Sequence, residues 1–231
     1  MYVDWGDGTM DEVDGNVSQL AHEYSSAGTF RVRITDNITS FAPSYNNSTW
    51  YSTTSQNRYT FKNVVRAGSR CASMPTYAFF YCTALSSIDF LGSSWTGLTS
   101  LPNYAFYYCT GLTQLSSLPA RIKTLGSYCF QYCAGLTGVQ DLRSAGLTSL
   151  YNPYTFANCA NVKEWKLPAS LTGTYFGTYE FYYNSNLSAM QLPASLTGIA
   201  GNCFYNCSQL KSITIPSQVA NIGANAFREC P

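Results

Sequence analysis

The stretch Ser208–Cys230, SQLKSITIPSQVANIGANAFREC, decides the fold of this chain. It begins with an apolar strand-like segment from Leu210 to Ile215, turns at Pro216, and ends with Phe227 and Cys230 three residues apart. A unit of this length cannot enclose its own apolar face. It therefore predicts further copies stacked against it.

Copies of this unit fill the second part of the chain. Seven phenylalanines recur at spacings of 27, 24, 26, 25, 23 and 23 residues: Phe79, Phe106, Phe130, Phe156, Phe181, Phe204 and Phe227. A cysteine follows six of them after three residues, at Cys82, Cys109, Cys133, Cys159, Cys207 and Cys230, and Asn184 stands at the seventh place. This register predicts a solenoid in which one phenylalanine and one thiol of each coil point inward.

Each coil is predicted to contain three parts. The strands are expected at Leu85–Phe90, Leu112–Leu115, Leu136–Val139, Val162–Leu167, Leu187–Leu192 and Leu210–Ile215. Next comes a return segment with apolar residues five and eight positions before the following phenylalanine, such as Ile122 and Leu125. A short helical turn around the phenylalanine closes the coil.

The N-terminal part differs from the repeats. Residues 2–41 read as paired strands with a tight turn at Asp7-Gly8, and residues 42–57 read as a polar linker. The pieces WGDGT, HEY and AGTFRVRI resemble the second half of a polycystic-kidney-disease (PKD) domain, an extracellular β-sandwich. We expect residues 1–57 to act as an N-terminal β cap and residues 58–231 to form the solenoid.

The repeat pattern, IxIPxxVxxIGxxAFxxCxxLxxI, resembles the BspA-like class of leucine-rich repeats over residues 59–231. The resemblance implies an α/β repeat fold: a right-handed solenoid of about seven coils with a parallel β-sheet on one face and short helical turns. Proteins of this class occur on bacterial and protozoal surfaces, where their roles are adhesion and host or matrix binding. The resemblance therefore implies a binding protein rather than an enzyme.

The composition narrows the possible partners. A net charge of +1 with only 11% charged residues gives no electrostatic case for binding nucleic acid or an anionic membrane. No apolar run approaches the roughly 20 residues that span a bilayer. Many Ser, Thr, Asn and Tyr residues with few charges are typical of secreted surface proteins. We expect an extracellular or cell-surface location, which includes a place in a viral particle.

Nine cysteines leave at least one thiol unpaired within the chain. Neighbouring coils lie about 4.8 Å apart, and disulfides accept Cα separations of about 4.4–6.8 Å, so adjacent rungs meet the distance requirement for a disulfide. Cysteine also packs as a small apolar residue, and buried free thiols are the favoured alternative.

The sequence offers little for catalysis. Its one histidine, His22, lies outside the repeats, so no Ser-His-Asp set can be assembled on the solenoid. No phosphate loop, zinc motif or EF-hand spacing is present, and we expect no catalytic residue, metal or cofactor. Glu180 stands where other coils carry Ala, Cys or Thr, and we interpret it as a solvated charge at an edge.

Tyrosine placement is the most informative surface feature. Tyrosines recur two residues before the repeat phenylalanines and one or two residues after them, at positions that must partly face outward. Tyrosine is common at recognition surfaces, although a ladder of rings that seals the core explains the same pattern. The candidate binding residues are Tyr107, Tyr108, Tyr132, Tyr182 and Tyr183, with Lys163, Glu164 and Lys166 on the strand face.

These observations support two functional hypotheses. The first is a non-catalytic extracellular adhesion module that presents its repeat surface to a protein or glycan on a host or matrix. The second is a structural subunit of a filament, layer or particle that associates end to end through the C-terminal coil. Concentration-dependent light scattering separates them, because a monomer at high concentration argues against self-stacking.

Overall fold

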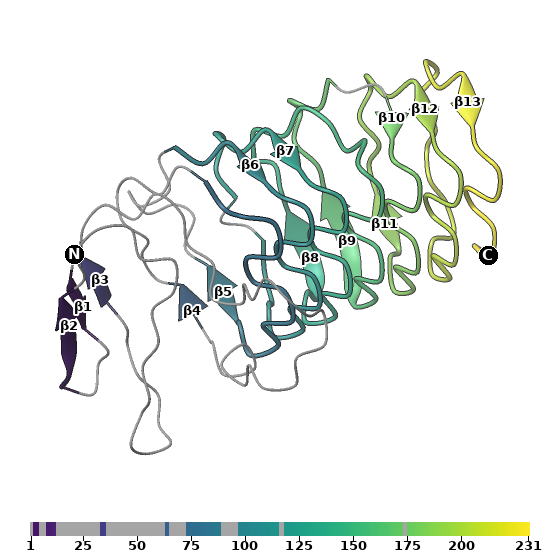
Figure 1. Cartoon of the computed structure of the whole chain (residues 1–231). Coiled ribbons are helices and arrows are strands. Elements are labelled where there is room, and N and C mark those ends of the chain that lie inside the picture. The colour runs from purple at the N-terminus through teal and green to yellow at the C-terminus, as the bar shows by residue number, and fades with distance from the viewer. Residues whose placement is uncertain are drawn as a thin grey trace.

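The computed structural model describes residues 2–4, 8–12, 33–35, 63–64, 73–88, 97–115, 118–172 and 175–231. In the repeat region the chain winds into a parallel-strand solenoid (Figure 1). One row of strands comprises β4 (Asn63–Val64), β5 (Ser87–Ile88), β8 (Gly138–Asp141), β9 (Val162–Lys166) and β11 (Ala189–Met190). A second row comprises β6 (Ser100–Leu101), β7 (Thr124–Leu125), β10 (Tyr175–Phe176), β12 (Gly198–Ile199) and β13 (Asn221–Ile222).

Every strand pair of the solenoid is parallel. The first row pairs as β4-β5 and β8-β9-β11, and the second as β6-β7 and β10-β12-β13. The second row was expected only as a return segment with apolar anchors, so its ladder is an additional finding. Strand pairing extends over about five turns, while the phenylalanine column has seven rungs.

The expected strand at residues 112–115 is absent. The backbone groups that would pair with a neighbouring strand are hydrogen-bonded to a side chain instead. Gln140, which is fully buried on β8, accepts from the Leu115 N–H at 3.0 Å and donates to the Thr113 carbonyl at 3.2 Å. Beside it, the register of β8 against β9 shifts at Gly138, whose φ of 63° suits glycine. Residues 210–215 likewise form no paired strand, so that prediction is also wrong.

The N-terminal residues that the structure describes form a separate antiparallel sheet in the order β2-β1-β3. Its strands are β1 (Tyr2–Asp4), β2 (Met10–Glu12) and β3 (Arg33–Thr35). Gly8, with a φ of 94°, lies in the connection between β1 and β2. The HEY segment, His22, Cys71 and the linker at 42–57 lie outside the described residues, so the PKD resemblance and the proposed cap stay predictions.

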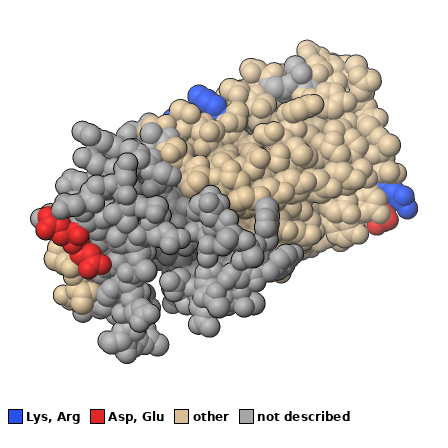
Figure 2. Space-filling model, in the orientation of Figure 1, with Lys and Arg blue, Asp and Glu red and all other residues tan. Residues whose placement is uncertain are grey.

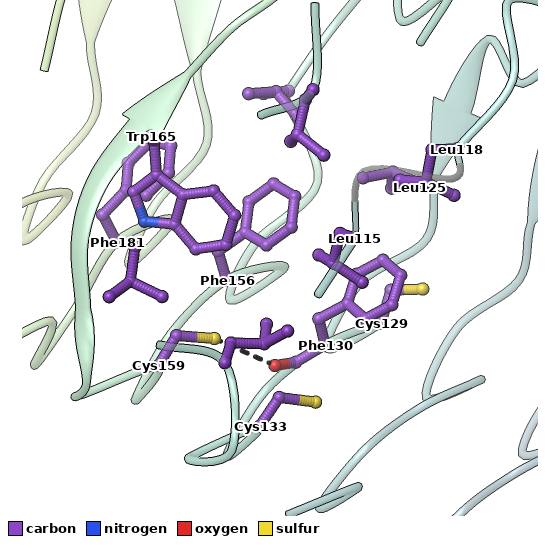
Figure 3. Packing of buried hydrophobic residues seen from close by; sticks show 14 of the residues in the cluster. Leu115, Leu118, Leu125, Cys129, Phe130, Cys133, Phe156, Cys159, Trp165 and Phe181 are labelled. Carbon is purple, nitrogen blue, oxygen red and sulfur yellow. Dashed lines mark hydrogen bonds between the residues drawn. The ribbon is translucent and has the colours of Figure 1, made fainter. Parts of the chain in front are cut away.

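A column of stacked phenylalanine rings forms the centre of the solenoid, as predicted. Rings of successive coils lie 5.1–5.9 Å apart between centroids, with interplanar angles of 3–12°. All rings from Phe79 to Phe204 are fully buried, and Phe227 is half-buried. Trp165 of β9 packs beside the column at 4.4 Å from Phe156 (Figure 3). These contacts join the coils into one continuous core.

The repeat cysteine is a hydrogen-bond donor in the core. From the second coil on, each repeat thiol donates to the carbonyl of the phenylalanine one coil earlier, as in Cys159 Sγ to Phe130 O at 3.3 Å (Figure 3). Cys109, Cys133, Cys207 and Cys230 repeat this contact at 3.0–3.3 Å. Asn184 replaces a cysteine and performs the same role, because its Nδ2 donates to Phe156 O at 2.9 Å. All eight cysteines of the described residues are free thiols.

The segments around the phenylalanines are tight turns, and the described residues contain no helix, contrary to the expected helical turns. Within a turn, every second amide donates a hydrogen bond to the carbonyl three residues earlier, as Gln131 N does to Tyr128 O. The other amides donate to the next coil: Tyr128 N to Pro153 O, Phe130 N to Thr155 O and Tyr132 N to Ala157 O, at 2.9–3.1 Å. A helix would bond its amides internally, so these inter-coil bonds exclude one.

This turn geometry places two residues of every coil in the left-handed region, with φ of 54–66°. They are the residues two before and two after each phenylalanine: Tyr77, Tyr81, Tyr104, Tyr108, Tyr128, Tyr132, Tyr154, Asn158, Tyr179, Tyr183, Asn202, Asn206, Asn225 and Glu229. Asparagine tolerates this conformation well, whereas other side chains strain it. Tyrosine therefore needs a compensating interaction, which ring stacking provides.

We expect the choice of replacement at Tyr128 to separate backbone strain from stacking. Tyr128→Asn and Tyr128→Ala both remove the ring that lies between Tyr104 and Tyr154, but only alanine retains the left-handed strain. The alanine variant should therefore have a free energy of unfolding lower by about 1 kcal/mol than the asparagine variant, as measured by urea denaturation. Equal stabilities would contradict this account of the turn.

We expect Asn184→Cys to stabilise the protein. The substitution restores the donor used in the other coils and removes the buried Oδ1 of Asn184, which has no hydrogen-bond partner. An unsatisfied buried acceptor costs about 1–3 kcal/mol, so the free energy of unfolding should rise by about 1 kcal/mol or more. Asn184→Ala is the control: it leaves the Phe156 carbonyl without its donor and should destabilise. A cysteine variant that behaves like the alanine variant would contradict the donor role.

Candidate binding surface

A column of five tyrosines runs along the outside of the phenylalanine turns. Tyr77, Tyr104, Tyr128, Tyr154 and Tyr179 stack in order, with centroids 4.4–4.9 Å apart and interplanar angles of 4–22°. Each is half-buried and stands two residues before a buried phenylalanine. The inter-coil hydrogen bonds of the turns thus set the spacing of these rings.

Further aromatic side chains lie beside this column. The residues one and two positions after the phenylalanines contribute Phe80, Tyr81, Tyr107, Tyr108, Tyr132, Tyr182, Tyr183 and Tyr205. They contact the column through pairs such as Tyr104 with Tyr107 at 5.7 Å and Tyr179 with Tyr182 at 5.2 Å. We call the column and these neighbours together the tyrosine face.

Four tyrosines of this face have hydroxyl groups that stay protonated at physiological pH. Burial, with repulsion from neighbouring tyrosines, raises the pKa of Tyr107 and of Tyr154 to about 12. The pKa values of Tyr104 and Tyr182 are raised for the same reasons. Hydroxyls in this state both donate and accept hydrogen bonds.

The tyrosine face is almost free of charge. The turn segments from 75–84 to 200–209 contain one ionisable acid, Glu180, and it is buried. In the last turn Arg228 and Glu229 form an ion pair, and the Tyr205 hydroxyl donates to Glu229 at 2.7 Å. In the view of Figure 2, the described coil surface is uncharged apart from small charged areas at its upper margin and its C-terminal end.

The tyrosines predicted as binding residues lie on this face. Tyr108, Tyr132 and Tyr183 are exposed, and Tyr107 and Tyr182 are half-buried. The ladder explanation of the tyrosine pattern is confirmed, because the rings stack from coil to coil. The rings also reach the surface, and the binding role of the predicted residues stays a prediction. The stacked column from Tyr77 to Tyr179 was not among the predicted site residues. The tyrosine that recurs two residues before five of the repeat phenylalanines is the sequence pattern that indicates it.

The predicted charged residues lie elsewhere on the coil. Lys163, Glu164 and Lys166 belong to β9, where Lys163 is exposed and the other two are half-buried. Their neighbour on β8 is a strong ion pair, in which Arg143 donates to both carboxylate oxygens of Asp141 at 2.6–3.1 Å and lowers the pKa of that carboxyl to about 2. This strand face therefore carries charges of both signs, with three basic residues against two acidic ones.

Glu180 lies inside the solenoid, so its interpretation as a solvated edge charge is wrong. Its side chain is fully buried at the position that is Ala105 or Ala226 in other coils, and neither carboxyl oxygen has a partner in hydrogen-bonding geometry. Burial raises the pKa of Glu180 well above its ordinary value, and nearby Thr155 offsets only part of the effect. The inward direction follows from the register, since the residue directly precedes the buried Phe181.

The described residues contain no metal-binding cluster, and four buried thiols of the repeats are held protonated. Burial raises the pKa of Cys133 to about 12, and those of Cys109, Cys129 and Cys159 are also well above their ordinary values, so these thiols stay protonated. No group of three His, Cys, Asp or Glu side chains that could hold a metal occurs within the described ranges. The same residues include no helix able to cross a bilayer.

Stacked parallel coils around an apolar column define a solenoid scaffold, a class whose members are typically binding proteins rather than catalysts. The sequence profile of the BspA-type leucine-rich repeat region, which comprises six copies, matches residues 44–172 and 99–231. The chain therefore belongs to the BspA-type leucine-rich repeat family. Comparison with curated protein sequences gave no match.

Crystal structures of two bacterial leucine-rich repeat proteins are similar to this chain. The protein from Eubacterium ventriosum is 23% identical, with a TM-score of 0.60 over 73% of this chain and 42% of its own. The protein from Bacteroides ovatus is 20% identical, with a TM-score of 0.58 over 74% and 42%. Both support the fold, and this chain spans about two fifths of the length of either protein.

We expect Glu180 to make the stability of the solenoid fall as the pH rises. The folded-state pKa is raised, so this group stabilises fully below its unfolded pKa of about 4.3, and the stabilisation is lost as the pH rises towards the folded pKa. Between these values, the free energy of unfolding should drop by up to about 1.4 kcal/mol per pH unit relative to Glu180→Gln.

Urea titrations of the wild type, Glu180→Gln and Glu180→Ala over this pH range test the expectation. Glu164→Gln removes a carboxyl group from the strand face and is the matched control, which should follow the wild type. Parallel pH profiles for the wild type and both Glu180 variants would contradict the buried neutral carboxyl.

Proposed function

We propose that the chain is a non-catalytic binding module outside the cell, and that the tyrosine face is its contact surface for a protein or glycan. The observation that carries the proposal is the alignment of tyrosines from successive coils into one continuous, half-exposed and uncharged surface. Such a surface presents many identical polar edges on a rigid scaffold.

The physical properties of the face favour recognition. Tyrosine combines a large apolar body with a hydroxyl group and loses little conformational entropy on binding. Here the rings are already fixed by stacking and by the inter-coil hydrogen bonds of their own backbone. A preorganised surface binds more tightly because less order must be created on association.

Two features support a location at the cell surface. The chain has few charged residues and many tyrosines, a composition typical of secreted proteins, and the BspA-like class implies surface adhesion. We include adhesion to a host or matrix surface in the proposal on these grounds.

End-to-end self-association stays a separate prediction. The amides of Asn225, Phe227 and Glu229 hold the positions that in each earlier described coil donate to the next coil. The light-scattering measurement described above tests whether a second copy supplies acceptors for them.

We expect the triple variant Tyr108→Asn, Tyr132→Asn and Tyr183→Asn to lose binding and keep its fold. Asparagine already stands at the equivalent left-handed positions Asn158 and Asn206, so the turns should form normally. Truncating an interface tyrosine commonly costs 1–2 kcal/mol, so the affinity for fixed epithelial cells or a glycan array should fall by about 100-fold or more.

The control for this triple variant is the double variant Lys163→Ser and Lys166→Ser on the strand face. It should bind like the wild type, with circular dichroism confirming the fold of both proteins. Full binding by the asparagine variant, or loss of binding by the lysine variant, would refute the assignment of the tyrosine face.

A further inference from the structure

We propose that the ligand of the tyrosine face is a linear, uncharged polysaccharide that lies along the solenoid axis and is held by the hydroxyl groups of the tyrosine column. This inference rests on the proposed binding function and names the ligand class for the same surface. The inference follows from the orientation of the rings, the distance between them, the absence of charged side chains on this surface and the hydrogen-bonding capacity of the hydroxyl groups.

The first step is the orientation of the rings. Tyr104, Tyr128 and Tyr154 each have a ring stacked on both faces, at 4.4–4.9 Å between centroids. The flat apolar faces are therefore used inside the column, and the accessible part of each side chain is its edge with the hydroxyl. Within the column, a partner that needs an open aromatic face finds none on Tyr104, Tyr128 or Tyr154, whereas a hydrogen-bonding partner finds a row of hydroxyls.

The second step is the spacing of this row. The rings are nearly parallel, so their hydroxyls follow one another at about the same 4.4–4.9 Å interval as the centroids. An extended peptide presents side chains of one face only every two residues, at about 6.6–6.8 Å, and does not match this interval. An extended polysaccharide advances by one sugar ring at a time and carries hydroxyls on each, which gives a repeat of comparable length.

The third step is the absence of charge. The turns carry no exposed ionisable acid or base before Arg228 and Glu229, which pair with each other. An anionic glycan or a charged protein surface would find no counter-charge in these turns. An uncharged ligand with many hydroxyl groups needs no counter-charge, so the lack of charged side chains does not weaken its binding.

The fourth step is the hydrogen-bonding capacity of the row. A tyrosine hydroxyl carries one O–H donor and acceptor sites for further hydrogen bonds, and the column brings five such hydroxyls into one row. A polyhydroxyl chain both donates and accepts, which suits this mixed row better than a partner of one kind.

The test removes the hydroxyls and retains the rings. The triple variant Tyr104→Phe, Tyr128→Phe and Tyr154→Phe keeps the stacked column, and the double variant Tyr151→Phe and Tyr175→Phe is the matched control outside the tyrosine face. Binding of both proteins and the wild type to cello-, xylo-, manno- and laminari-hexaose is measured by calorimetry at low and high salt, with a heparin hexasaccharide as the charged probe.

We expect the wild type and the control to bind at least one neutral hexasaccharide independently of salt, and the triple phenylalanine variant to bind about tenfold more weakly or worse, because up to three hydrogen bonds are lost. Unchanged binding by the triple variant, or preference for the heparin probe, would overturn the inference. If the wild type binds epithelial cells but no neutral hexasaccharide, the ligand class is wrong and the proposed function stands; if it binds neither, both fail.

Discussion

The hydrogen bonds between the phenylalanine turns of successive coils are the constraint on which the rest of this structure depends. Alternate amides of each turn donate to the next coil, while those between them close the turn itself. In the turn at residues 128–133, every backbone donor is thereby used without a helix or a strand. The resulting distance between coils stacks the phenylalanine rings. It also brings a repeat thiol to the carbonyl of the phenylalanine in the preceding coil, as Cys133 is brought to Phe106.

The same constraint produces the candidate binding surface. Two residues of each turn must adopt the left-handed conformation, and in most coils these residues are tyrosines whose rings stack on the neighbouring coil. The same repeating turn therefore supplies the buried phenylalanine of the core and the tyrosines of the surface. The tyrosine face is nearly uncharged because the turns hold tyrosine, asparagine and small residues at these positions, and the same turns stabilise the solenoid.

Much of this arrangement could be predicted from the sequence. The interval between phenylalanines and the cysteine three residues later were sufficient to predict the inner column, because stacking in register requires such regularity. The second strand row was missed, since two-residue strands leave no alternation to detect. The strand expected at 112–115 failed because Gln140 inserts its side chain, a tertiary contact between distant coils. The burial of Glu180 was also missed. A charged residue is usually exposed, although its repeat position directly before Phe181 is an inward-facing one in the other coils.

Amide hydrogen exchange tests the central claim most directly. The amides of Phe106, Phe130 and Phe156 each donate to the next coil, so they should exchange only when the stacked coils separate. The account predicts that all three exchange slowly, with one common free energy of opening close to that of global unfolding. Rapid exchange of these amides, or three unrelated and small opening energies, would contradict it.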